Sequence, residues 1–220
     1  MTRPRMQRPL LLGHRGARAV RSIQENSLRS FDRALSDGCD GFEFDVRLTA
    51  DREAVIWHDE KFKGLQIARS SAEDLSRLAR LEQVLERYQQ TAFLDIELKV
   101  PGLEELILWL LKKHPPERGF VVSSFLPEVL RNLRERRRQL PLGLICETQV
   151  ELRQWKRIDV EYVIPQYKLV NALLIQKLKA AGKKILVWTV NPAKQMGRFA
   201  DAGVDGIISD DTELLAKLGP

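Results

Sequence analysis

The stretches 42-FEFDV-46 and 94-LDIELK-99 alternate apolar and charged residues. Successive side chains of a β-strand point to opposite faces, so Glu43 and Asp45 share one face of the first strand. Asp95, Glu97 and Lys99 likewise share one face of the second strand. The other faces are aromatic or aliphatic, and we expect them to be buried. Carboxylates that converge in a packed interior are costly unless they bind a cation or take part in chemistry.

Strand-like runs alternate with stretches of helical spacing along the whole chain. Leu28, Phe31 and Leu35 are three and four residues apart, and Gly38 follows as a helix stop. The expected strands are 10–13, 41–46, 92–98, 119–123, 142–146, 162–165, 184–190 and 206–209. The expected helices are 28–35, 75–85, 103–110, 127–138, 169–181, 192–202 and 211–218. Eight strands separated by helices in one domain of 220 residues predict an α/β fold, a compact (β/α)8 TIM barrel.

Residues 46–59 break this alternation, because no helix fits between two β-like runs. We predict a β-hairpin that leaves the barrel rim after the second strand and returns to it. A two-residue turn at Asp51-Arg52 would place Asp45 opposite His58, with both side chains on one face. A shift by one residue would put them on opposite faces. The turn also lacks the glycine that two-residue hairpins favour.

Polar residues gather where the predicted strands end, which is the end at which (β/α)8 barrels build their active sites. The residues in question are His14, Arg15, Glu43, Asp45, His58, Glu97, Lys99, Ser123, Ser124, Glu147, Gln166 and Trp188. A divalent cation held by Glu43, Asp45 and Glu97 would suit phosphoryl transfer on a diester, because it would polarise the phosphoryl oxygens. A site built only from oxygen ligands favours Mg²⁺ or Ca²⁺ over zinc.

The remaining charged residues of this set suit the same chemistry. Arg15 and Lys99 are candidates for binding phosphate oxygens, and His14 and His58 for a general acid and base, because imidazole titrates near neutral pH. Trp188 is interpreted as an apolar wall for a glycerol group. The alternative to a metal site is that the three carboxylates form a buried salt-bridge network with Arg47, Lys99 or Arg15. The ion pairs of such networks rarely offset the desolvation of their charges.

Eight short motifs, in this order between about Leu11 and Asp210, resemble the glycerophosphodiester phosphodiesterase family. They are His14-Arg15-Gly16, Glu25-Asn26, Glu43-Phe44-Asp45-Val46, His58-Asp59, Glu97-Leu98-Lys99, Ser124-Phe125, Trp188-Thr189-Val190-Asn191 and 205-DGIISD-210. The resemblance implies one barrel domain of this family over residues 1–220, which hydrolyses glycerophosphodiesters to sn-glycerol 3-phosphate and an alcohol.

The resemblance also implies particular roles for the site residues. It implies that Glu43, Asp45 and Glu97 bind one divalent cation, and that His14 and His58 form the acid/base pair. A glycerol hydroxyl would attack phosphorus to give a cyclic phosphate, which water then opens. The resemblance does not assign the base in either step.

The chain departs from the family pattern at several places. Gln24 and Ser27 flank Glu25-Asn26 where the family usually has Pro and Thr, and Asp51-Arg52 replaces the usual Asp-Gly of the hairpin. The segment after His58-Asp59 is compressed to about 60–76. Because that segment helps to shape the pocket in the family, the alcohol specificity is the property most affected.

Composition and charge bear on partners and location. The net charge is +6, and the arginine run at 134–138 is interpreted as a helix end rather than a nucleic-acid surface, since no aromatic platform accompanies it. No apolar run approaches the ~20 residues of a membrane span, so we expect no stable membrane insertion. Cys39 and Cys146 are expected to be buried free thiols, which favours the cytoplasm.

We therefore expect a small-molecule glycerophosphodiester as the partner and no nucleic acid. Two alternatives stay open, a lysophospholipid-cleaving relative and a non-catalytic barrel that binds phosphodiesters. The first would need an exposed apolar rim, and the second predicts the loss of a site histidine or carboxylate, all of which are present. The oligomeric state and the alcohol preference are not indicated by any pattern in the chain.

Overall fold

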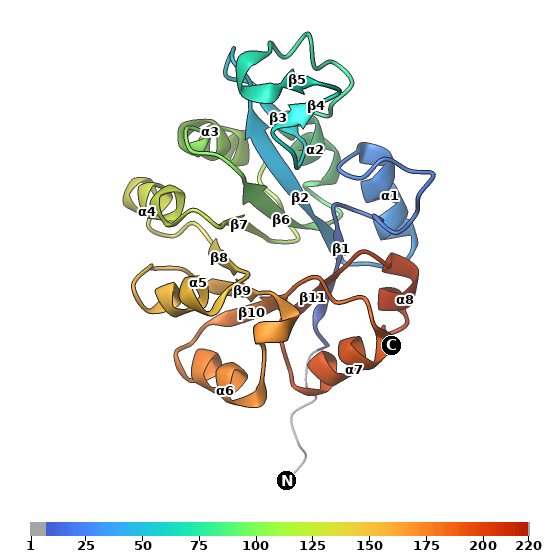
Figure 1. Cartoon of the computed structure of the whole chain (residues 1–220), viewed down its shortest axis with the longest axis vertical. Coiled ribbons are helices and arrows are strands. Elements are labelled where there is room, and N and C mark those ends of the chain that lie inside the picture. The colour runs from blue at the N-terminus through green and yellow to red at the C-terminus, as the bar shows by residue number, and fades with distance from the viewer. Residues whose placement is uncertain (1–7, 220) are drawn as a thin grey trace.

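Parallel strands form a closed ring in the computed structural model, which describes residues 8–219 (Figure 1). β1 pairs with both β2 and β11, and this double pairing closes the barrel. The ring strands of the described residues are β1 Leu10–His14, β2 Gly41–Leu48, β6 Phe93–Leu98, β7 Phe120–Ser124, β8 Leu142–Cys146, β9 Tyr162–Pro165, β10 Lys184–Val187 and β11 Gly206–Ser209. The (β/α)8 prediction is confirmed.

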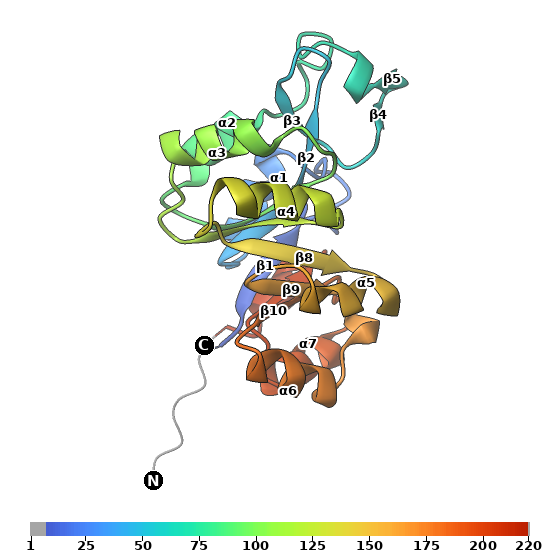
Figure 2. The same ribbon diagram turned by 90° about the vertical axis from the view of Figure 1, so that its left-hand side faces the viewer.

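Helices lie outside the ring, as both views show (Figure 1, Figure 2). Their bounds are α1 Leu28–Ser36, α2 Leu81–Tyr88, α3 Glu104–Lys113, α4 Pro127–Arg136, α5 Gln149–Arg153, α6 Ala172–Ala180, α7 Ala193–Asp201 and α8 Thr212–Ala216. Short 3₁₀ turns η2 Gln154–Lys156 and η3 Tyr167–Leu169 follow β8 and β9. Among the described residues, no helix is both long enough and apolar enough to cross a membrane.

Alternation along β2 and β6 separates an apolar face from a charged face, as predicted. Phe42 and Phe44 are fully buried between the barrel and the helices, and Phe31 of α1 stacks on Phe42 with ring centroids 4.2 Å apart. Glu43 and Glu97 line the cavity at the barrel mouth instead. The outer faces thus anchor the strands, and the inner faces carry the charges.

The predicted hairpin exists, but its predicted register is wrong by one residue. β2 pairs antiparallel with β3 Ala54–Ile56, and Val46 lies opposite Ile56. The loop is longer than predicted, because Thr49 N–H donates to Glu53 O and three residues lie between them. Arg52, at φ 65°, supplies the left-handed residue that three-residue hairpin loops use. Asp45 is therefore not paired with His58.

His58 reaches the site because it lies beyond the end of β3, where strand alternation no longer fixes its direction. The chain then forms β4 Lys61–Phe62, β5 Leu65–Gln66 and the 3₁₀ turn η1 Ile67–Arg69. We call residues 49–80 the excursion; it stands out from one edge of the barrel (Figure 2). It has its own small apolar cluster, composed of Val55, Phe62, Ile67, Leu75 and Leu78, with Trp57 packed against it.

The structure differs from the predicted helices in two places. The helix expected over 75–85 begins only at Leu81, because Leu75 and Leu78 belong to the apolar cluster of the excursion. Helix α5 was not predicted. It is five residues long and carries a capping box between Thr148 and Glu151, which was the available sequence signal.

Candidate active site

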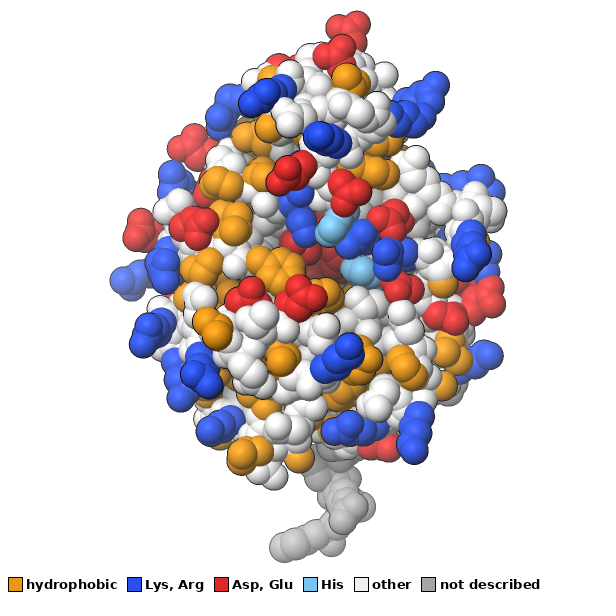
Figure 3. Space-filling model, viewed as in Figure 1, with side chains coloured by type: hydrophobic (Ala, Val, Ile, Leu, Met, Phe, Trp, Pro, Cys, Tyr) orange, Lys and Arg blue, Asp and Glu red, His pale blue; other side chains and the backbone are white. Residues whose placement is uncertain are grey.

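A cavity of about 520 Å³ opens at the carboxyl ends of the barrel strands. Figure 3 shows this face, with histidine side chains at a central hollow and acidic and basic side chains gathered around them. Of the twelve polar residues expected at the strand ends, eight line the cavity: His14, Arg15, Glu43, His58, Glu97, Lys99, Glu147 and Trp188. Asp45 lies just beneath, with 1% of its surface exposed. The structure thus brings together the eight residues to which a role is assigned, whereas Ser123, Ser124 and Gln166 do not line the cavity.

Three carboxylates converge in this cavity floor because β2 and β6 are adjacent. Asp45 is level with Glu97 in the parallel pairing, and Glu43 precedes Asp45 by two residues on the same face. Each of the three offers an oxygen, and these oxygens lie within 4.8 Å of one another. Glu43 Oε1 is buried and accepts no hydrogen bond among the described residues, whereas Asp45 Oδ1 and Glu97 Oε1 both face the Lys99 ammonium. Three converging carboxylates, one with a buried oxygen that accepts no hydrogen bond, fit a bound cation.

The electrostatics of the three carboxylates point the same way. Burial, followed by the charge of Asp45, raises the pKa of Glu97 to about 7 and raises that of Glu43 well above its usual value. Burial also opposes ionisation of Asp45, but Lys99 and Arg15 outweigh it and lower the pKa of that carboxyl. The cluster therefore gathers more carboxylate than its neighbours neutralise, and a divalent cation would offset the excess.

Both predicted phosphate-binding cations are tied to this cluster. Lys99 Nζ lies 2.6 Å from Glu97 Oε1 and 3.4 Å from Asp45 Oδ1. Arg15 Nη1 donates to Glu25 Oε1 at 2.8 Å, and its Nε is 3.2 Å from Asp45 Oδ2. These ion pairs hold the two cations at the cavity wall.

The loop after β1 is shaped to hold Asp45 and Glu43. Asn26, at φ 53° and fully buried, donates from Nδ2 to Asp45 Oδ2 at 2.7 Å and accepts from Asp45 N–H. Arg15, at φ 51°, donates its backbone N–H to Glu43 Oε2 at 3.0 Å. Gly16, at φ 80°, follows, and a Cβ there would lie 2.4 Å from Ser30 Oγ. Left-handed residues at a functional site are typical of a loop under constraint.

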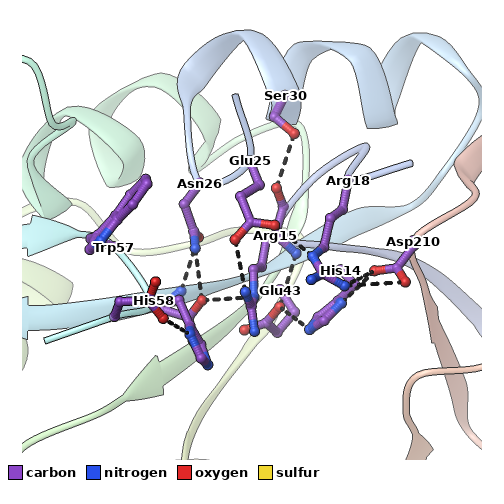
Figure 4. Close-up of polar contacts among 12 residues, drawn as sticks. His14, Arg15, Arg18, Glu25, Asn26, Ser30, Glu43, Trp57, His58 and Asp210 are labelled. Carbon is purple, nitrogen blue, oxygen red and sulfur yellow. Dashed lines mark hydrogen bonds and ion pairs between the residues drawn. The ribbon is translucent and has the colours of Figure 1, made fainter. Parts of the chain in front are cut away.

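The two histidines come from different parts of the fold (Figure 4). His14 ends β1, with Nδ1 2.7 Å from Asp210 Oδ1 and Nε2 3.8 Å from Glu43 Oε2. His58 comes from the excursion, with Nδ1 2.7 Å from Asp59 Oδ1. Burial lowers the pKa of His58, against the opposite effect of the Asp45 charge. A neutral imidazole at this position is suited to accept a proton.

Trp188 lines the cavity as part of an apolar wall, and its contact with a glycerol group stays a prediction. Its indole Nε1 donates to Ile164 O at 2.9 Å, and its ring meets Phe125 edge to face at 5.7 Å between centroids. Ile145 and Ile208 line the same side of the cavity, so one half is apolar and the other is charged. The strand ends at Val187, earlier than expected, which leaves Trp188 just beyond it.

Two contacts of the site were not foreseen. Asp210, interpreted from the sequence as structural, contacts His14, and Asn191 Nδ2 donates to Asp210 Oδ2 at 2.7 Å. A signal was present in the sequence, because a closed barrel places its last strand beside its first. His14 and Asp210 directly follow Gly13 and Ser209, which are paired. Ser123 Oγ, the other case, donates to Asp95 Oδ1 at 2.6 Å on the barrel floor.

Comparison with known proteins gives a consistent result. The model of the glycerophosphoryl diester phosphodiesterase family matches residues 14–115 and 72–214 in two overlapping parts. Glycerophosphodiester phosphodiesterase of Caldanaerobacter subterraneus subsp. tengcongensis is 31% identical over 238 residues, which cover 95% of this chain and 97% of the relative.

Solved structures show the same architecture. A glycerophosphodiester phosphodiesterase from Thermotoga maritima superposes with a TM-score of 0.83 at 26% identity, and the match covers 96% of this chain and 99% of that one. A phosphodiesterase from Oleispira antarctica, solved in complex with the product sn-glycerol 3-phosphate, reaches a TM-score of 0.84 at 22% identity, covering 96% of each chain. The latter likeness shows the shared fold.

Proposed function

The chain belongs to the glycerophosphoryl diester phosphodiesterase family, and we propose that it hydrolyses glycerophosphodiesters to sn-glycerol 3-phosphate and an alcohol. One observation carries the proposal beyond family membership. Two histidines and two cations surround three buried carboxylates whose oxygens lie within 4.8 Å of one another, and Glu43 Oε1 accepts no hydrogen bond among the described residues. Lys99 and Arg15 do not neutralise all three carboxylates together with Glu25, so the site has an excess of negative charge that a divalent cation would offset.

We assign one divalent cation, Mg²⁺ or Ca²⁺, to Glu43, Asp45 and Glu97. The residues fit such an ion because all their donor atoms are oxygens and lie within 4.8 Å of one another. When bound, the ion would polarise phosphoryl oxygens and offset their charge. The carboxylates stay close to Lys99 and Arg15, so the phosphate would meet fixed cations on the same side of the cavity.

The other residues act on the substrate directly in this proposal. Arg15 and Lys99 bind phosphate oxygens, and Trp188 packs against the glycerol carbons. One histidine of the pair His14 and His58 removes the proton of a glycerol hydroxyl as its oxygen bonds to phosphorus. The other protonates the alcohol oxygen as its bond to phosphorus breaks. Water then opens the cyclic phosphate with the two proton transfers reversed.

Release of sn-glycerol 3-phosphate from glycerophosphocholine and glycerophosphoethanolamine tests this function. We expect turnover that EDTA abolishes and that added Mg²⁺ or Ca²⁺ restores. His14→Ala should remove activity while metal binding, measured by calorimetry, persists. Turnover of lysophosphatidylcholine alone would favour the lysophospholipid reading, and binding of glycerophosphocholine without turnover would favour a non-catalytic barrel.

We also propose a cytoplasmic location. Cys39 and Cys146 are both free and buried, and burial raises the pKa of each thiol to about 12, so neither is a reactive thiolate. Free thiols in the interior support a reducing compartment. Fractionation of the producing cells, followed by an activity assay of each fraction, tests this location.

A further inference from the structure

We propose that Asp210 is a positioning residue, which holds the His14 ring with its proton on Nδ1 and its Nε2 free toward the cavity. The inference rests on the proposed function, in which His14 transfers a proton to or from the substrate. It adds a residue that acts through His14, does not line the cavity and makes no hydrogen bond to Glu43, Asp45 or Glu97.

Barrel closure brings the two residues together. β1 and β11 are parallel neighbours with Gly13 level with Ser209, so the residues that follow these positions, His14 and Asp210, end side by side. His14 Nδ1 lies 2.7 Å from Asp210 Oδ1, the length of a charge-assisted hydrogen bond. The opposite ring nitrogen, Nε2, lines the cavity side, 3.8 Å from Glu43 Oε2.

The chemistry of the contact selects one tautomer. An ionised carboxylate can only accept hydrogen bonds, so a ring nitrogen bonded to it must carry a proton. Burial alone would raise the pKa of Asp210, but His14, Asn191 and Arg18 together lower it far below its usual value. Asp210 is therefore an anion at neutral pH. The neutral ring of His14 then has its lone pair on Nε2, where a proton can be exchanged.

Asp210 is itself held on both oxygens. Oδ2 accepts from Asn191 Nδ2 at 2.7 Å, and Oδ1 accepts from Arg18 Nη1 at 3.2 Å as well as contacting His14. The backbone N–H of Asp210 donates back to Asn191 Oδ1 at 3.0 Å. Arg18 is held by Glu25, whose oxygen accepts from Nε at 2.5 Å. A carboxylate anchored in this way can fix the orientation of the ring (Figure 4).

The second histidine provides a matched control within the same cavity. His58 Nδ1 and Asp59 Oδ1 are also 2.7 Å apart, but Asp59 is the next residue in sequence and its side chain is 69% exposed, against 17% for Asp210. In the described part of the chain Asp59 accepts no other side-chain hydrogen bond. Water competes for such an exposed carboxylate, so its contribution is small.

Steady-state kinetics with glycerophosphocholine at saturating metal test the proposal. Asp210→Asn, which keeps the shape and loses the charge, should lower kcat at least about 100-fold, with KM changed less than about threefold. Asp59→Asn should lower kcat less than about fivefold. Asn191→Ala, which removes one of the bonds that hold Asp210, should lower kcat about tenfold. Thermal unfolding checks that each variant is folded.

Nitrogen-15 NMR of the imidazole rings reads the tautomer without activity. The chain has three histidines, so His58→Gln and His114→Gln assign the signals. We expect the Nδ1–H form of His14 in the wild-type protein and a shift toward the Nε2–H form in Asp210→Asn. An unchanged kcat in Asp210→Asn, equal losses in Asp210→Asn and Asp59→Asn, or an Nε2–H ring in the wild type would overturn the proposal.

The two readouts also separate this inference from the proposed function. If the wild-type protein turned over no glycerophosphodiester, the function would fail while the ring measurement still decided the Asp210 contact. If Asp210→Asn did not fold, the kcat of Asn191→Ala would decide instead, and a value equal to that of the wild type would contradict the positioning role.

Discussion

The ring wall around His14 and the excursion that carries His58 support the two histidines in different ways. His14 ends a barrel strand, its side chain is 11% exposed, and its partner Asp210 follows the neighbouring strand. The side chain of His58 is 35% exposed, and the residue follows the short hairpin strand β3, which is not part of the ring. The excursion beneath it packs around a separate apolar cluster.

This difference teaches that the two halves of the proposed acid/base pair can be perturbed separately. A strand hydrogen-bonded on both sides moves only if the ring opens, whereas a small cluster at one edge can open by itself. The predictions below use this contrast, from the side where we expect the largest effect to the side where we expect the smallest.

Asp45→Ala attacks the ring wall where the charges are most densely coupled. Loss of this carboxylate leaves Lys99 and Arg15 without their shared partner in a buried site. We expect the free energy of unfolding to fall by about 3–5 kcal/mol, together with loss of metal binding and turnover. Urea denaturation and calorimetric metal titration measure the two effects. An active variant that still binds metal would contradict the site.

Ile67→Ala attacks the apolar cluster of the excursion instead. Ile67 is 1% exposed and belongs to the apolar cluster of the excursion, which is distinct from the clusters of the barrel. We expect a cost of about 2–4 kcal/mol, confined to the excursion, and reduced turnover because His58 loses its support. Hydrogen exchange should quicken over residues 54–78 and stay unchanged in β7 to β10. Val122→Ala, in the ring, serves as the matched control and should affect global unfolding. Uniform quickening in Ile67→Ala would show that the excursion is not separate.

The stability of the metal-free protein should depend on pH through Glu97 in the ring wall. Unfolded Glu97 loses its proton near 4.5, whereas the folded carboxyl keeps it to about 7. Between these values the folded state binds more protons, so the free energy of unfolding falls as the pH rises. Glu97→Gln should remove the contribution of Glu97 to this decrease in the free energy of unfolding. The contribution corresponds to several degrees in the thermal unfolding midpoint. Parallel midpoint curves for the two proteins over this range would contradict the assigned pKa.

Arg52→Gly gives the smallest expected effect and concerns the hairpin turn. Arg52 holds φ at 65°, a conformation that glycine adopts without strain. We expect a gain of about 0.5–1 kcal/mol in the stability of the excursion, reduced by loss of the Arg52 bond to Gly102 O. Glu53→Gly, at a position without positive φ, should destabilise the same turn. A stabilising Glu53→Gly would refute the turn geometry.

The ring strands and their carboxylates could be predicted from the sequence, whereas the hairpin register and the Asp210 contact could not. The alternation at 42–46 and 94–99 predicted the buried strands and the cluster of carboxylates, because adjacent parallel strands bring their ends together. The hairpin register was missed because Arg52 takes a left-handed conformation that side chains other than glycine rarely adopt. The Asp210 contact was missed because it depends on barrel closure rather than on any local spacing.

Closure of the ring also has a consequence for synthesis of the protein. His14 and Asp210 are 196 residues apart, so His14 is synthesised long before the residue that contacts it. A ribosome-bound chain that already contains β2, β6 and their carboxylates still lacks β11, which pairs with the other edge of β1. In the proposed mechanism, proton transfer at the His14 ring therefore waits until β11 has been synthesised and has paired with β1.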